Sequence, residues 1–144
     1  MAFTGNFMCT SFKVEILKAV HNFTNSTGNT FRCAMYTNSA SFTAATTAYT
    51  ASNEVTGTAY VAKGNALVNV TPTSTSTTAF TDFSDTTWSS STITARGAMI
   101  YNDSATADPS VVILDFGSDK SSSSGDFTIV FPTADSTSAI IRIA

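Results

Sequence analysis

The sequence predicts a mainly β fold, an antiparallel two-sheet sandwich of the jelly-roll type, with about eight strands and one N-terminal helix. Short apolar segments rich in β-branched and aromatic residues recur at intervals of about ten residues, with turn residues between them. The 144 residues include 26 Thr and 20 Ser, and Thr suits the pleated, half-exposed surface of a sheet. Strands and helices do not alternate, as they would in a parallel α/β sheet.

The chain divides into an N-terminal arm, residues 1–9, and a single β-sandwich domain, residues 10–144. The length fits one domain and leaves no room for a second of ordinary size. Phe3, Phe7 and Met8 make the arm apolar. They precede any element that could bury them locally, and exposed apolar residues of this size favour association. We therefore expect these three residues to be buried against a partner subunit, with burial on their own domain as the alternative.

One helix is expected over residues 11–21, with Thr10 or Ser11 as its N-cap. Its apolar positions follow helical spacing and would pack on the sheet: Phe12, Ile16, Ala19, Val20 and Phe23. The helix should end where the turn-rich segment 22–28 begins.

Strands are expected in the second part of the chain. Their approximate ranges are 30–37, 57–61, 66–71, 79–83, 86–89, 93–101, 111–116, 127–131 and 139–143. The apolar run at 111–116 is typical of a central strand that is buried on both faces. Residues 39–53 and the serine-rich segment 117–125 are expected to be loops.

Composition excludes several classes of protein. An apolar fraction of 42% with only 12% charged residues argues against disorder. A net charge of −3 favours neither nucleic acid nor an anionic membrane as a partner, and no apolar run has the length of a membrane span. The first residues lack the pattern of a secretion signal, so we expect assembly in a reducing cytoplasm. Cys9 and Cys33 are expected to be buried or half-buried free thiols, with a disulfide between them as the less favoured alternative.

Few side chains are suited to chemistry, and we expect no enzymatic activity, no cofactor and no metal. The single histidine, His21, is expected at a helix end near the last carbonyls. Three loose acidic pairs are interpreted as turn or strand-edge residues, with a surface calcium site as a less favoured alternative and paired catalytic carboxylates as the least favoured. These pairs are Asp82 with Asp85, Asp103 with Asp108, and Asp115 with Asp119.

Two arginines lie in strand-like segments. Arg96 and Arg142 are each expected to face solvent at a strand edge or to form an ion pair between subunits. The triplet Asp115-Phe116-Gly117 matches the magnesium-binding triplet of protein kinases, but the other kinase motifs are missing. We therefore interpret its glycine as a turn at a strand end.

Several stretches resemble a family of small structural proteins from tailed-phage particles. The resemblance spans most of the chain, and its main segments are 8–13, 21–23, 31–36, 47–55, 93–98, 112–117 and 125–132. It implies a virion protein, most similar to capsid decoration or cement proteins, which often have β-sandwich or jelly-roll folds. The resemblance implies no catalytic residues.

We expect a structural protein of the virion that bridges and stabilises major capsid subunits, with contacts through Phe3, Phe7 and Met8. Other virion subunits and further copies of the chain are also expected partners. A structural protein associated with the tail, collar or fibre is the alternative. A carbohydrate-binding or hydrolytic β-sandwich is less favoured; it would line a groove with aromatic residues such as Tyr49, Tyr60, Trp88 or Tyr101.

Overall fold

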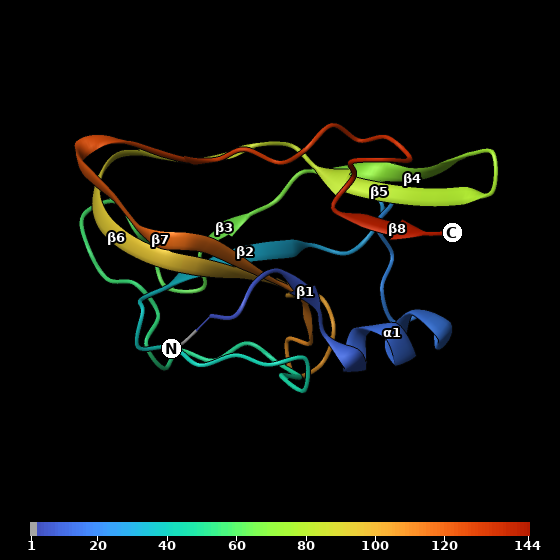
Figure 1. Cartoon of the computed structure of the whole chain (residues 1–144), viewed down its shortest axis with the longest axis horizontal. Helices are drawn as coiled ribbons and strands as arrows, with labels where there is room; N and C mark the ends of the chain where they lie inside the picture. The colour runs from blue at the N-terminus through green and yellow to red at the C-terminus, as the bar shows by residue number, and fades with distance from the viewer. Residues whose placement is uncertain (1–2) are drawn as a thin grey trace.

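The computed structural model describes residues 3–144, which form eight strands and one helix (Figure 1). The strands build two antiparallel sheets, so the predicted mainly β sandwich with one helix near the start is confirmed. In chain order the elements are β1 (Phe7–Met8), α1 (Thr10–Leu17), β2 (Phe31–Tyr36), β3 (Asn65–Ala66), β4 (Asn69–Thr75), β5 (Thr78–Phe83), β6 (Thr86–Asn102), β7 (Ser110–Ile129) and β8 (Ile141–Ile143).

The larger sheet has the strand order β1-β7-β6-β2-β3, and the smaller sheet has the order β4-β5-β8. β2 pairs with β6 from Phe31 opposite Asn102 to Tyr36 opposite Gly97. β1 pairs with β7, where Phe7 lies opposite Ile113. β1 and β8 are therefore edge strands, and each has one side available for a further strand.

The two longest strands, β6 and β7, pair with each other along most of their length. The pairing register shifts at four places, and such bulges bend and twist a strand pair. Figure 1 shows the pair turning back over itself at the end away from the smaller sheet. The rings of Phe116 and Phe127, which lie on the two halves of β7, are 6.2 Å apart.

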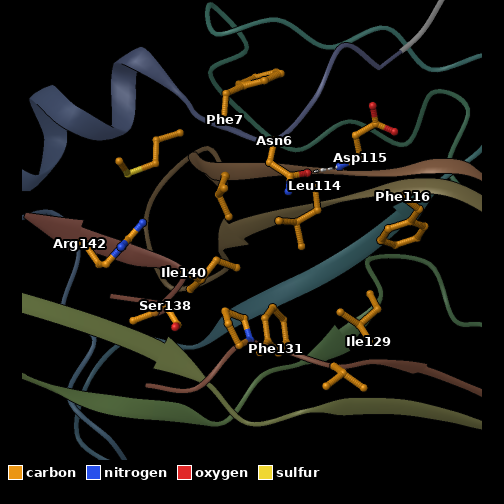
Figure 2. A pocket seen from close by; sticks show the side chains of 15 residues that line it. Asn6, Phe7, Leu114, Asp115, Phe116, Ile129, Phe131, Ser138, Ile140 and Arg142 are labelled. Carbon is orange, nitrogen blue, oxygen red and sulfur yellow. Dashed lines mark hydrogen bonds between the residues drawn. The ribbon is translucent and has the colours of Figure 1, made fainter. Parts of the chain in front are cut away.

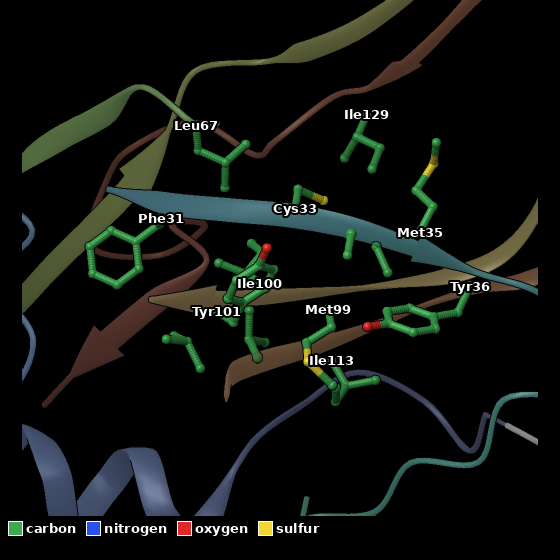
Figure 3. Packing of buried hydrophobic residues seen from close by; sticks show 14 of the residues in the cluster. Phe31, Cys33, Met35, Tyr36, Leu67, Met99, Ile100, Tyr101, Ile113 and Ile129 are labelled. Carbon is green, nitrogen blue, oxygen red and sulfur yellow. The ribbon is translucent and has the colours of Figure 1, made fainter. Parts of the chain in front are cut away.

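This bend buries the larger sheet on both faces. Cys33 and Met35 of β2 point toward the returning half of β7, where Ile129 lies, and Tyr36 points the other way (Figure 3). The second face is covered by the leading segment, α1 and the long loop 37–64. Phe42 of that loop contacts the Tyr36 ring edge-on at 4.7 Å.

The helix differs from its prediction. It ends at Leu17, and Ala19 adopts a left-handed conformation with φ of 57°, so residues 18–21 leave the helix. Its N-cap is Cys9, which makes no side-chain cap, and the backbone N–H of Thr10 donates instead to the carbonyl of Ala44. Of the expected apolar face, Phe12 is buried within the helix and Phe23 is buried beyond its end, whereas the helix residue Leu17 is 88% exposed. The predicted span 11–21 is therefore too long.

The serine-rich segment 117–125 is a second difference, because β7 runs through it without a break. The serine hydroxyls pair with hydroxyls on β6. Ser91 Oγ lies 2.7 Å from Ser122 Oγ, and Thr94 Oγ1 lies 2.8 Å from Ser121 Oγ. These cross-strand hydrogen bonds satisfy polar side chains that would otherwise favour turns.

The predicted strand at 57–61 does not form, and its place is taken by one isolated bridge between Thr58 and Thr92. Residues 39–53 form a loop without a strand, as predicted. Two further isolated bridges, Tyr36 with Glu54 and Ala48 with Pro109, fasten the loop 37–64 to the larger sheet.

Candidate interaction site

A groove of about 470 Å³ opens between the two sheets on the side where β1 and β8 lie. Its walls come from β1, from both halves of β7 and from the segment that leads into β8 (Figure 2). Leu114, Phe131 and Ile140 point into the groove in that view. The site is open and mainly apolar, so it is suited to holding a chain segment or a flat protein surface.

The apolar surface continues beyond this groove. A neighbouring hollow of about 470 Å³ shares Phe116, Ile129 and Val130 with it. Val130 is 73% exposed although it lies between two buried residues, Ile129 and Phe131. Together the two hollows follow the inside of the bend in β7.

Phe7 and Met8 lie at the rim of the groove. Both belong to β1, are half-buried and pack on the core. The backbone of β1 is held by β7 on one side only, since β1 is an edge strand. These two of the three expected interface residues are therefore accessible to a partner in the isolated chain.

The position of Phe3 contradicts the expectation that it is buried against a partner subunit. Phe3 is 1% exposed and packs in the core of its own chain, where its ring meets that of Phe42 edge-on at 5.6 Å. The sequence could not show this, because the slot for Phe3 is made by residues far along the chain. Residues 1 and 2 of the expected arm 1–9 lie outside the described residues.

Asp115 fastens the leading segment to β7. Its carboxylate accepts hydrogen bonds from the backbone N–H of Gly5 at 3.0 Å and of Gly117 at 2.8 Å, and its own backbone N–H donates to Asn6 Oδ1. Arg96 Nε lies 3.1 Å from Asp115 Oδ1 and forms an ion pair with this carboxylate. The ion pair of Arg96 is therefore made within one chain. The Gly117 N–H, followed by Arg96 and Gly5, holds the pKa of Asp115 below its ordinary value despite partial burial. The kinase-like triplet thus has a structural role here.

Arg142 of β8 also lines the groove, and its guanidinium donates to the carbonyl of Thr137. It is exposed, as expected for an arginine at a strand edge. Of the two arginines, Arg142 is the one whose charge is available to a partner.

His21 lies outside the helix, in a cage formed by the rings of Phe12, Phe23 and Phe31. Its Nε2 is 2.9 Å from Glu15 Oε2, and its Nδ1 is 3.0 Å from Asn102 Nδ2. Asn102 Oδ1 accepts the N–H of Ser104, so its amide nitrogen must donate to His21 Nδ1. His21 Nε2 then donates to Glu15, and the imidazole joins α1 to β6.

The aromatic residues considered for a sugar-binding groove are used inside the molecule. Trp88 and Tyr101 are buried. Tyr49 and Tyr60 donate their hydroxyl hydrogens to Glu54 at 2.6 and 2.7 Å. Burial, and then these bonds to Glu54, raise the pKa of both tyrosines. This cluster secures the loop 37–64, and its aromatic faces do not line the groove at β1.

The acidic pairs are likewise engaged in structural contacts. Asp82 is buried and accepts the N–H groups of Phe83 and Ile140, and Asp85 accepts that of Phe131. These bonds hold the segment after β7 against β5. The two carboxylates of the second pair share Lys63, with distances of 3.3 Å to Asp103 and 3.1 Å to Asp108. Across residues 3–144, no three His, Cys, Asp or Glu side chains gather as metal ligands would.

Cys9 and Cys33 are free and fully buried, as predicted. Burial raises the pKa of Cys33 to about 12 and also raises that of Cys9. In the part of the chain that the structure describes, no helix has the length and hydropathy that crossing a bilayer requires.

The fold and the groove define a β-sandwich whose open side carries an apolar surface between two edge strands. Comparison of the chain with protein-family models, with curated proteins and with solved structures finds no match. Sequence reasoning missed the groove itself. A signal was present in the apolar residues on both sides of Pro132, in 129–131 and 139–141, which exceed what one short strand can bury.

Proposed function

We propose that the chain is a structural protein of a tailed-phage virion, assembled in the host cytoplasm, that decorates the capsid and bridges neighbouring major capsid subunits. The observation that carries this proposal is the open groove between the sheets, with Phe7 and Met8 at its rim. The resemblance to phage decoration proteins supports it from the sequence.

A role in binding, without catalysis, is supported by how the reactive side chains are used. His21 bonds to Glu15 and Asn102, and the tyrosine cluster bonds to Glu54. None of these groups lines the groove at β1. The surface that remains accessible there is mainly apolar, and it stabilises a complex by being removed from water.

The edge strands add a specific mode of contact. β1 and β8 stand on either side of the groove, and an extended segment of a capsid subunit could pair with one edge while its side chains enter the groove. Each such contact is modest, but a decoration protein binds the assembled lattice in many copies. Because it binds the assembled shell only, it stabilises that shell by mass action.

The test compares particle occupancy of a groove variant with that of a matched surface variant. Replacing Phe7 and Met8 by Ser removes apolar groups that are half-buried at the rim, and Leu17→Ser removes an exposed leucine of α1. We expect the double variant to fold but to be lost from purified particles, and Leu17→Ser to be retained. Full occupancy of the double variant, or loss of Leu17→Ser instead, would overturn the role of the groove.

A further inference from the structure

We propose that Phe3 is an exchangeable plug: the slot beside Gly97 that holds Phe3 also accepts the Phe3 of a second copy, so that two copies trade their leading segments. The inference rests on the proposed role as a subunit of an assembly, and it adds how copies of the chain bind one another.

The slot is built for this one side chain. A Cβ at residue 97 would lie 2.4 Å from Cε1 of Phe3, so the ring uses space that only glycine leaves open. Phe42 closes the slot on another side at a ring distance of 5.6 Å. A segment with the same sequence is the occupant that reproduces these contacts, and a second copy supplies it.

Gly5 is the point at which the segment can swing. Its φ is +114°, a conformation that residues with a side chain rarely adopt, and apart from its two neighbours in the chain no atom of the described residues lies within 4 Å of where its Cβ would be. On the far side of this residue, Asn6 bonds to Asp115 and β1 pairs with β7. Rotation at Gly5 therefore frees Phe3 while β1 stays in place, at the loss of the bond from Gly5 N–H to Asp115.

Exchange between copies costs little in contacts, because each slot is refilled by the same side chain. The closed form is favoured for a dilute chain, in which its own Phe3 is always near the slot. The exchanged form becomes more populated relative to the closed form as the local concentration of copies rises. Many copies side by side on one surface create such a high local concentration.

The test is the dimer dissociation constant of the purified chain, measured by sedimentation. Gly5→Ala disfavours the left-handed conformation of the closed form, and we expect it to tighten dimerisation by about tenfold for each exchanged arm. The combined Phe3→Ala and Gly5→Ala variant lacks the plug and should stay monomeric. Gly125→Ala, whose added Cβ would lie 3.7 Å from the carbonyl of Ser123, is the matched control and should behave as the wild type.

A second measurement does not depend on Gly5. A Phe3→Cys copy is mixed with a Phe42→Cys copy under mild oxidation. A double variant with both changes in one chain tests whether the two positions are close enough to form a disulfide. The native Cys9 and Cys33 are buried and should not react. We expect a mixed disulfide dimer, because the Phe42→Cys copy keeps its Phe3, which can fill the unaltered slot of the Phe3→Cys copy. An intrachain bond in the double variant without any mixed dimer would overturn the exchange. If the double variant forms no bond, the sedimentation result decides, and an unchanged constant for Gly5→Ala overturns the proposal.

The two proposals fail separately. Wild-type occupancy on particles without exchange in solution would overturn the plug alone. Exchange of the purified chain with no binding to particles would overturn the proposed function alone.

Discussion

Phe3 and Gly97 share one space in the core, although 93 residues separate them in the sequence: a Cβ added at residue 97 would lie 2.4 Å from the Phe3 ring. The same Cβ would also lie 2.4 Å from the carbonyl oxygen of Leu114, within the β6–β7 pairing. The leading segment and the central strand pair are thus packed as one unit.

Gly97→Ala should therefore destabilise the fold. Overpacking of a core costs about 1–3 kcal/mol, and the clash with backbone at Leu114 places this change toward the upper end. Urea unfolding followed by tryptophan fluorescence measures the loss. The control Gly125→Ala should remain within about 0.5 kcal/mol of the wild type. Equal stability of the two variants would contradict the close approach of both the Phe3 ring and the Leu114 carbonyl to residue 97.

The hydroxyl pairs between β6 and β7 give a second prediction. Ser91 is buried and its hydroxyl lies near Ser122 Oγ and the carbonyl of Gly125, so Ser91→Ala should cost about 1–2 kcal/mol. Thr87→Val removes the contact with Thr128 at an exposed position and should change stability by less than about 0.5 kcal/mol. Thermal unfolding of both variants checks this. A larger loss of stability for Thr87→Val than for Ser91→Ala would contradict the buried position of Ser91 and the exposed position of Thr87.

Asp82 and Asp115 should affect the pH dependence of stability in opposite directions. Burial raises the pKa of Asp82 in the folded state, so its contribution is present at low pH and is lost as pH rises through that pKa. The pKa of Asp115 is lowered, so its contribution is present above the unfolded pKa and is lost as pH falls through the folded pKa.

The measurement is the free energy of unfolding of Asp82→Asn and Asp115→Asn, each compared with the wild type between pH 3 and pH 7. The stability advantage of the wild type over Asp82→Asn should shrink as pH rises, and its advantage over Asp115→Asn should grow. If the stability differences of both variants from the wild type change with pH in the same direction, the direction of the pKa shift assigned to one of the two carboxylates is wrong.

The fold class was predictable because its signals are local. Alternating apolar residues, the high Thr content and turn residues at short intervals all favour strands, and the eight strands of residues 3–144 bear this out. The serine run at 121–124 shows the limit of such signals. Serine favours turns by itself, and only the hydroxyl partners on β6 hold these residues in a strand.

The candidate site was predictable only in part. Phe7 and Met8 were identified because an apolar segment ahead of the domain must be covered by something. The location of Phe3 depends on Gly97 and Phe42, and that of His21 on Asn102, so neither follows from the residues nearby in the sequence. The groove is formed by pieces of three strands and a connecting segment, and only the folded chain brings them together.

The most direct test of the proposed function is a cryo-EM reconstruction of purified particles of the phage that encodes this chain. We predict many copies distributed over the capsid, with the groove beside β1 and β8 covered by a neighbouring capsid subunit. A few copies at a single vertex would assign the chain to the tail or collar. A particle without the chain, or one in which this groove faces solvent in every copy, would contradict the proposal.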